Sequence, residues 1–218
     1  VLTASGGPFR TFDAKKLRTV TPADALKHPT WSMGSKITID SASLANKGLE
    51  VIEACRLFDM PPDRVKVVVH PQSLVHSMIR TRDGVLYAQI SKPDMRHPII
   101  SALSWPEYLP NHLEAFDFDK LCTMQFEPPR YADFPLLGLA YRAAGLGGAY
   151  TIAYNAANEV AVAAFLAGAL SFPGLAELTG SVLENDWSAE PADFDAVFEA
   201  DARARACAES YLSGMAHS

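Results

Sequence analysis

Cysteine is scarce in this chain of 218 residues, which contains Cys55, Cys122 and Cys207. The three have no CxxC spacing and lie in apolar or helical contexts, so the sequence indicates neither a zinc site nor a disulfide framework. This cysteine usage fits a reducing compartment.

Long apolar runs are also missing. None approaches the roughly 18 to 20 residues that a membrane helix needs, and the amino terminus does not have the charged-then-apolar pattern of a signal peptide. We therefore expect no membrane partner. The sequence begins with Val, and VLTAS starts abruptly as though inside a strand. We expect the chain to be a fragment, with any targeting segment upstream.

Excess positive charge is absent beyond residue 50. The chain has a net charge of −6, but residues 1–50 hold seven Lys and Arg against four acids, which gives +3 there and leaves −9 elsewhere. Nucleic-acid binders usually show a basic stripe and a high pI, so this pattern argues against nucleic acid and suits a small anionic ligand.

What is present is enough apolar sequence for a packed core, at 49% hydrophobic and 20% charged residues. We expect an α/β catalytic domain, with a mixed sheet and helices, over residues 1–104, then a linker over 105–130. An α-helical bundle domain should follow over 131–218, since four segments with helical patterns are separated there by Gly or Pro. In the first domain we predict these elements: a strand at 36–41, a helix at 44–58, a strand at 65–70, a hairpin at 73–90 and a short helix at 97–105.

Two loops are candidates for ligand contact. The stretch SGGPFR (5–10) has a hydroxyl and two glycines that allow backbone amides to approach an oxyanion, or it is simply a turn. HPTWSMGSK (28–36) places Trp31 and Met33 in a polar loop without a regular period. We predict a lid over residues 25–35 that closes on a ligand, the alternative being a loop that Trp31 anchors permanently to the core.

The third candidate is DSASLANKGLE (40–50). Asn46, Lys47 and Glu50 share a polar helix face, and Ser41 lies close to the helix start. Unsatisfied N–H groups and the helix dipole favour a phosphate at such a terminus. Glu50 is placed to bind a hard divalent cation, but one carboxylate is too few. The alternative is an ordinary capped helix with a Lys47–Glu50 surface pair.

Three further polar positions favour structural roles. His70 and His76 lie in apolar strand contexts, so we expect hydrogen-bonded core histidines rather than ligands. The polar stretch NAANE (155–159) lies in a very apolar helix, and we expect it to tie that helix to neighbouring backbone.

Taken together, SGGPFR, HPTWSMGSKITIDSASLANKGLE, HPQSLVHSMI, PDMRHPI and NAANE follow one another with separations that match a known family. The chain resembles the carboxy-terminal part of the 1-deoxy-D-xylulose 5-phosphate reductoisomerases, from residue 1 to the last helix. Five collinear motifs are far more specific than one short pattern.

The resemblance implies reduction by NADPH and a divalent metal, Mg²⁺ or Mn²⁺, in the conversion of 1-deoxy-D-xylulose 5-phosphate into 2-C-methyl-D-erythritol 4-phosphate. This reaction belongs to non-mevalonate isoprenoid biosynthesis. The resemblance also implies a homodimer in a bacterial cytoplasm or a plastid stroma. By position, the implied roles are as follows: substrate binding at Ser5, His28, Ser41, Asn46, Lys47 and Glu50; catalysis at Glu50 and His28; metal binding at Glu50; a cofactor contact at Gly34; and a lid formed by Trp31 and Met33.

Two parts of the family pattern are missing from these 218 residues, namely the glycine-rich nucleotide-binding domain and an Asp-Ser-Glu segment with two further metal ligands. We therefore expect the isolated chain to bind metal poorly and to have little or no activity. Two alternatives stay open. One is a paralogous reductase of the same pathway with a remodelled lid, against which the HPTWSMGSK loop argues. The other is a non-catalytic dimerisation or binding fragment.

Overall fold

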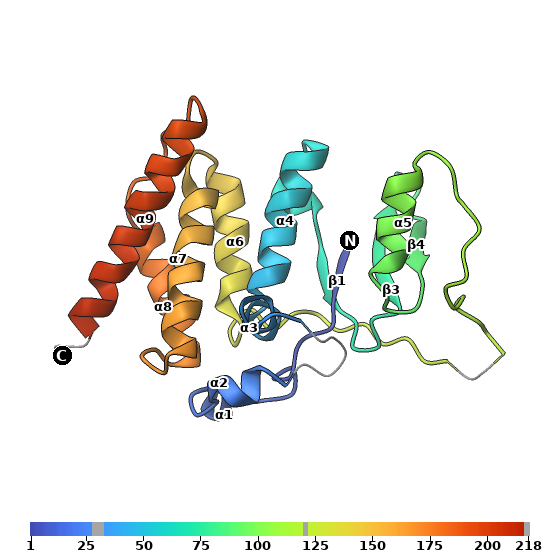
Figure 1. The fold of residues 1–218 in the computed structure, drawn as a ribbon, viewed down its shortest axis with the longest axis horizontal. Helices are drawn as coiled ribbons and strands as arrows, with labels where there is room; N and C mark the ends of the chain where they lie inside the picture. The colour runs from blue at the N-terminus through green and yellow to red at the C-terminus, as the bar shows by residue number, and fades with distance from the viewer. Residues whose placement is uncertain (28–32, 120–121, 216–218) are drawn as a thin grey trace.

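The computed structural model describes residues 1–27, 33–119 and 122–215. Within them a small mixed sheet is followed by a bundle of helices, as the sequence predicts (Figure 1). In chain order the elements are β1 (Leu2–Ala4), α1 (Ala14–Leu17), α2 (Pro22–Ala25), α3 (Ser35–Ser43), α4 (Ala45–Phe58), the 3-10 helix η1 (Pro62–Arg64), β2 (Val67–Val69), β3 (Val75–Arg80), β4 (Leu86–Ile90), α5 (Arg96–Ser104), α6 (Pro135–Leu146), α7 (Tyr150–Leu166), α8 (Phe172–Leu183) and α9 (Phe194–Met215).

The described strands form one sheet in the order β2-β1-β3-β4. Strand β1 pairs in parallel with β2 and antiparallel with β3, and the β3–β4 hairpin is antiparallel, as predicted. A parallel neighbour requires a crossover connection, and the chain from α1 to α4 provides it. This crossover brings α3 and α4 beside the start of the chain.

The prediction of a strand over residues 36–41 is wrong, because these residues lie in helix α3. Ile37, Thr38 and Ile39 carry the β-branched, alternating pattern that favours a strand. In the structure Gly34 is the N-cap of α3, and its carbonyl oxygen accepts a hydrogen bond from the Thr38 hydroxyl at 2.8 Å. Ile39 is fully buried while Ile37 is 41% exposed, so tertiary packing overrides the local preference.

The helical region is layered. Figure 1 shows α9, α7 with α8, α6 and α4 following one another across the molecule toward the sheet. Helix α7 packs on both α8 and α9, and α6 packs along α4. Buried alanines on α7 allow these close approaches, because a small side chain keeps the helix axes near one another. The boundaries 1–104 and 131–218 stay predictions, and α4 of the first part packs directly on α6 of the second.

The described residues of the predicted linker, 105–119 and 122–130, lie between α5 and α6 and form no helix (Figure 1). Among their described residues the regular pairing is an isolated bridge between Glu127 and Val69. Arg10 adds an ion pair to Glu127 at 2.8 Å. Cys55, Cys122 and Cys207 are free, and no helix in the described ranges is both long and apolar enough to cross a membrane.

Candidate functional site

A cavity of about 630 Å³ lies where β1, the α3–α4 junction and β3 meet. Its lining includes six of the side chains that the sequence predicts for the site, drawn from four separate segments. They are Ser5, Met33, Ser41, Asn46, Lys47 and Glu50. The structure therefore assembles one site from residues that are up to 45 positions apart in sequence, between Ser5 and Glu50.

Three predicted residues are not placed in this cavity. His28 and Trp31 lie outside the described residues, so their roles stay predictions. Gly34 is the N-cap of α3 and is not among the residues that line the cavity. A Cβ at Gly34 would meet no described atom within 4 Å, so packing within the described chain does not require glycine there. The predicted cofactor contact of Gly34 remains a prediction.

The junction between α3 and α4 shapes the site. Leu44 joins the two helices in the left-handed conformation, with φ at 61°, and α4 starts at the next residue. Ser41 is therefore on the last turn of α3, and Asn46 and Lys47 are on the first turn of α4. The first N–H groups of a helix have no partner inside it and carry partial positive charge. The junction thus brings the Ser41 hydroxyl, the Lys47 side chain and the start of α4 to the same cavity.

Lys47 and Glu50 form an ion pair, and the Asn46 amide donates a hydrogen bond to the other Glu50 oxygen at 2.8 Å. The alternative interpretation expected such a pair on an open surface. In the structure it lines the cavity, and the Lys47 side chain is 11% exposed. A cation withdrawn from water interacts more strongly with an anion than an exposed lysine does, because the screening is weaker.

Glu50 supplies a carboxylate to the cavity, but the described residues do not complete a metal site. No group of three or more His, Cys, Asp or Glu side chains is arranged to hold a metal anywhere in the described ranges. A hard divalent cation takes six or more oxygen ligands, several from carboxylates or bound substrate. Glu50 therefore fits the role of one ligand, and the others must come from outside this set.

The cavity wall also includes residues that the sequence analysis did not assign to the site: Thr3, Ala4, Ile37, Leu44, Ser73, His76 and Met95. For Ser73 and His76 the signal was the stretch HPQSLVHS (70–77), whose histidines were expected to belong to the core. That expectation is confirmed for His70, which is fully buried and accepts a hydrogen bond from the Leu74 amide. Its Nδ1 donates to the Gln125 carbonyl oxygen at 2.8 Å.

His76 differs from His70 because it reaches the cavity. Its Nε2 lies 2.9 Å from the Ser91 hydroxyl oxygen. Partial burial lowers the pKa of the His76 imidazole below its usual range, although the hydrogen bond to the Ser91 carbonyl oxygen opposes that change. The lowered pKa favours the uncharged form of the ring at the cavity wall.

Fold and cavity together define an α/β unit with a helical bundle, in which Ser41, Asn46, Lys47 and Glu50 line one cavity at the α3–α4 junction. Comparison with known proteins identifies its family. The chain matches the DXP reductoisomerase C-terminal domain over residues 90–207 and the 1-deoxy-D-xylulose 5-phosphate reductoisomerase C-terminal domain over residues 1–58. It belongs to the 1-deoxy-D-xylulose 5-phosphate reductoisomerase family.

Individual relatives agree. The 1-deoxy-D-xylulose 5-phosphate reductoisomerase of Treponema denticola is 52% identical over 208 residues, which cover 95% of this chain and 55% of the relative. That of Burkholderia pseudomallei is 48% identical over 215 residues, covering 99% and 54%. The chain thus spans about half the length of the curated relatives it matches.

Solved structures show the same relationship. The Zymomonas mobilis reductoisomerase in complex with NADPH has a TM-score of 0.91 at 45% identity, covering 97% of this chain and 54% of that one. A DOX-P reductoisomerase in complex with NADPH, fosmidomycin and magnesium has a TM-score of 0.89 at 38% identity, covering 97% and 54%. The fold of the described residues is that of the family.

Proposed function

We propose that the protein carrying this chain reduces and isomerises 1-deoxy-D-xylulose 5-phosphate to 2-C-methyl-D-erythritol 4-phosphate with NADPH and a divalent metal. The observation that carries the proposal is the convergence of Ser5, Ser41, Asn46, Lys47 and Glu50 on one cavity. The family relationship supplies the reaction, and relatives in complexes with NADPH and with magnesium support the cofactors. The bacterial sources of the relatives support a bacterial cytoplasm over a plastid stroma.

In this proposal the chain contributes the substrate phosphate site. Lys47 and the amino terminus of α4 hold the phosphate, while Ser5, Ser41 and Asn46 add hydrogen bonds around it. Binding energy from this remote group positions the reacting carbons and drives closure of the lid, which includes Met33. A substrate analogue that lacks the phosphate should therefore be turned over more slowly and also be bound more weakly.

Glu50 would be one ligand of the divalent cation. When bound, such a cation acts as a Lewis acid that stabilises charge developing on substrate oxygens. In the structure Asn46 and Lys47 both donate to Glu50, so the carboxylate is already oriented before a cation arrives. Substrate phosphate would then draw Lys47 away from Glu50, which frees that oxygen for the metal.

The test is an assay of the full-length gene product for NADPH consumption with 1-deoxy-D-xylulose 5-phosphate and magnesium. Lys47→Ala should raise KM about tenfold to a hundredfold, because a hydrogen bond to a charged group contributes about 1.5 to 3 kcal/mol. Lys15→Ala, which removes a positive charge from the exposed part of α1, should leave KM unchanged. Absence of turnover by the full-length protein would contradict the proposed function.

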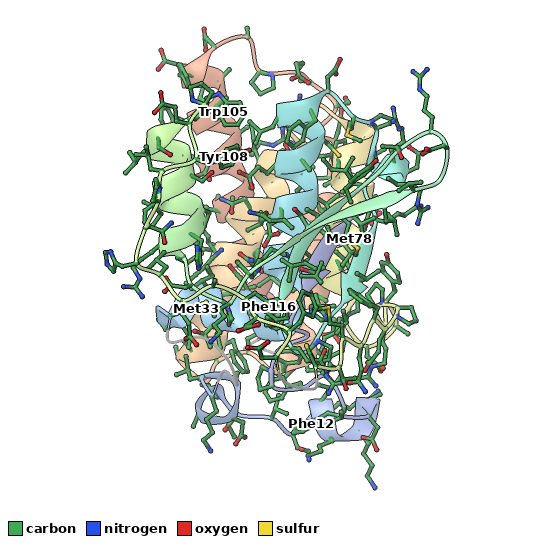
Figure 2. All side chains as sticks on the ribbon, turned by 90° about the vertical axis from the view of Figure 1, so that its right-hand side faces the viewer. Phe12, Met33, Met78, Trp105, Tyr108 and Phe116 are labelled. Atoms are coloured by element: carbon green, nitrogen blue, oxygen red, sulfur yellow. The ribbon has the colours of Figure 1, made fainter. Side chains whose placement is uncertain are left out.

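We also propose that the protein is a homodimer formed through the edge of the sheet. Every residue of β4 is exposed and β4 is the last strand of the sheet, so its outer backbone groups are open to a further strand. Large apolar side chains are also exposed on β3, β4 and α5 and just after α5, where Figure 2 labels Trp105 and Tyr108. Exposed members include Ile79, Leu86, Tyr87, Ile99, Leu103 and Trp105. A second copy offers the same edge, and twofold symmetry pairs such edges with one another.

A further inference from the structure

Asp40 is a buried carboxylate on α3 that faces away from the cavity. Its side chain is 2% exposed, and one oxygen lies 2.6 Å from the ammonium of Lys36. The other oxygen accepts a hydrogen bond at 2.8 Å from the amide of Asn158, which is 118 residues further along the chain on α7. The contact joins the helix that carries Ser41 to the centre of the helical bundle.

This arrangement is costly for the fold. A buried carboxylate loses its hydration, and desolvation raises the pKa of Asp40 above its usual range although Lys36 and Asn158 both oppose that change. Lys36 is on the first turn of α3, where the helix dipole disfavours a cation. Within the described part of the chain, the buried Oδ1 of Asn158 has no hydrogen-bond partner. Asn158 therefore acts here as a donor to Asp40, in a core where an apolar residue would pack without that cost.

The hydrogen bond between Asp40 and Asn158 lies next to residues of the cavity wall. Ser41 is the next residue and Ile37 is one turn earlier, and both line the cavity. Helix α3 also begins directly after Met33 and Gly34 of the predicted lid. Fixing α3 from its buried side thus fixes the side chains on its cavity side, because a helix turns as a rigid unit.

The same face of α7 also supports α4. Tyr154, one turn before Asn158, is fully buried against Gly48, the residue after Lys47. Both helices that carry the phosphate site therefore rest on one face of α7, although no α7 residue lines the cavity.

We infer that Asn158 and Asp40 are positioning residues, which hold α3 so that Ser41 stays aligned with Lys47 on α4. The inference rests on the proposed function for its kinetic consequence. NAANE thus ties its helix to a side chain through Asn158, rather than to neighbouring backbone as the sequence predicts.

The test compares Asn158→Ala with Thr179→Val in the full-length protein. Thr179 is fully buried on α8, and its hydroxyl donates to the Leu175 carbonyl oxygen at 2.8 Å, so its replacement also removes one buried hydrogen bond. Both variants should lower the melting temperature. Asn158→Ala should in addition raise KM for the phosphorylated substrate by up to about tenfold, the limit reached when substrate binding must supply the whole free energy of the lost hydrogen bond to realign α3. Thr179→Val should leave KM unchanged.

Exchanging the two residues, Asp40 and Asn158, tests whether the hydrogen bond itself restores substrate affinity. The double variant Asp40→Asn with Asn158→Asp recreates an amide-to-carboxylate hydrogen bond between α3 and α7, and it should restore most of the lost affinity. Wild-type KM in Asn158→Ala, or an equal rise of KM in Thr179→Val, would overturn the inference.

Hydrogen exchange separates this inference from the proposed function. In Asn158→Ala, the backbone amides of residues 36–43 should exchange at least about tenfold faster than in Thr179→Val, because α3 opens locally when its anchor is lost. Equal exchange of α3 in the two variants would overturn the positioning role even if the enzyme is active. Faster exchange in a protein that lacks reductoisomerase turnover would support the anchor and refute the reaction instead.

Discussion

Gly48 lies so close to Tyr154 that a Cβ at Gly48 would stand 2.9 Å from the Tyr154 hydroxyl oxygen. The same Cβ would be 2.6 Å from the Cβ of Ala140. The Tyr154 hydroxyl is itself held, because it donates to the Leu136 carbonyl oxygen at 3.2 Å. Helix α4 therefore approaches α6 and α7 at the one turn that also presents Lys47 to the cavity.

Gly48→Ala should displace α4 and reduce the free energy of unfolding by about 1 to 3 kcal/mol, the usual cost of overpacking a core. The shift should also weaken phosphate binding through Lys47. Gly138→Ala on α6 is the control, since its new Cβ would have Tyr131 at 3.8 Å, an ordinary contact. It should stabilise the protein by about 0.5 to 1 kcal/mol through helix propensity. Urea denaturation measures the free energy of unfolding of both variants. An unchanged value for Gly48→Ala would contradict the close packing at this position.

Glu50→Gln should have opposite effects on turnover and on anion binding. Loss of the carboxylate should reduce turnover at fixed metal by about a hundredfold or more, because a Lewis-acid cation contributes several kcal/mol to catalysis. Lys47 then loses its anionic partner, so inorganic phosphate should bind more tightly without metal. Calorimetric titration with phosphate and the NADPH assay measure the two effects.

Glu53→Gln, an exposed position on the same helix, is the control for charge and should change neither quantity. If Glu50→Gln bound phosphate more weakly than wild type, the view that Glu50 competes for Lys47 would be wrong.

His76 should make stability depend on pH on the acid side of neutrality. Burial lowers its pKa in the folded state below the ordinary value of 6.5, so the unfolded chain binds a proton that the folded protein does not. Its contribution is fully present above pH 6.5 and is lost as the pH falls toward the folded pKa. His76→Gln should remove this component from the urea-unfolding profile below pH 6.5.

His112→Gln, at an exposed position in the segment between α5 and α6, should leave the profile unchanged. A profile for His76→Gln that falls as steeply as that of the wild type would show that His76 is not the group responsible.

Tyr87→Lys should weaken the proposed homodimer. Tyr87 is 63% exposed on the edge strand β4, and a charge buried at a dimer interface is unfavourable. The dimer dissociation constant should rise at least about tenfold, as expected when an interface aromatic is lost. Phe198→Lys, equally exposed but on α9, should have no effect. Analytical ultracentrifugation measures the dimer dissociation constant of both variants. If Tyr87→Lys sediments like the wild type, the interface lies elsewhere.

Local patterns in the sequence were sufficient for most elements of this fold. The β3–β4 hairpin, the β2 strand and the four carboxy-terminal helices all follow from periodicity and from Gly and Pro punctuation. The polar face of α4 could also be predicted from the sequence, because Glu50 follows Lys47 by three residues and Asn46 by four on the same helix. The resemblance to the reductoisomerases, carried by long motifs in order, likewise needed the sequence alone and is confirmed.

What the tertiary structure decided were the properties that depend on residues distant in sequence. Residues 36–41 have a strand-like alternation, but they form α3 because Asp40 bonds to Asn158 and Ile39 is buried in the core. His70 and His76 have similar local sequence, yet one is enclosed and the other reaches the cavity. The burial and the hydrogen-bond partners of a side chain are set by packing between elements. The spacing of apolar residues, every two in a strand or every 3.6 in a helix, does not show which distant element packs against them. The types of residue that line the cavity were thus determined by the sequence, and their meeting at one cavity by the packing between distant elements.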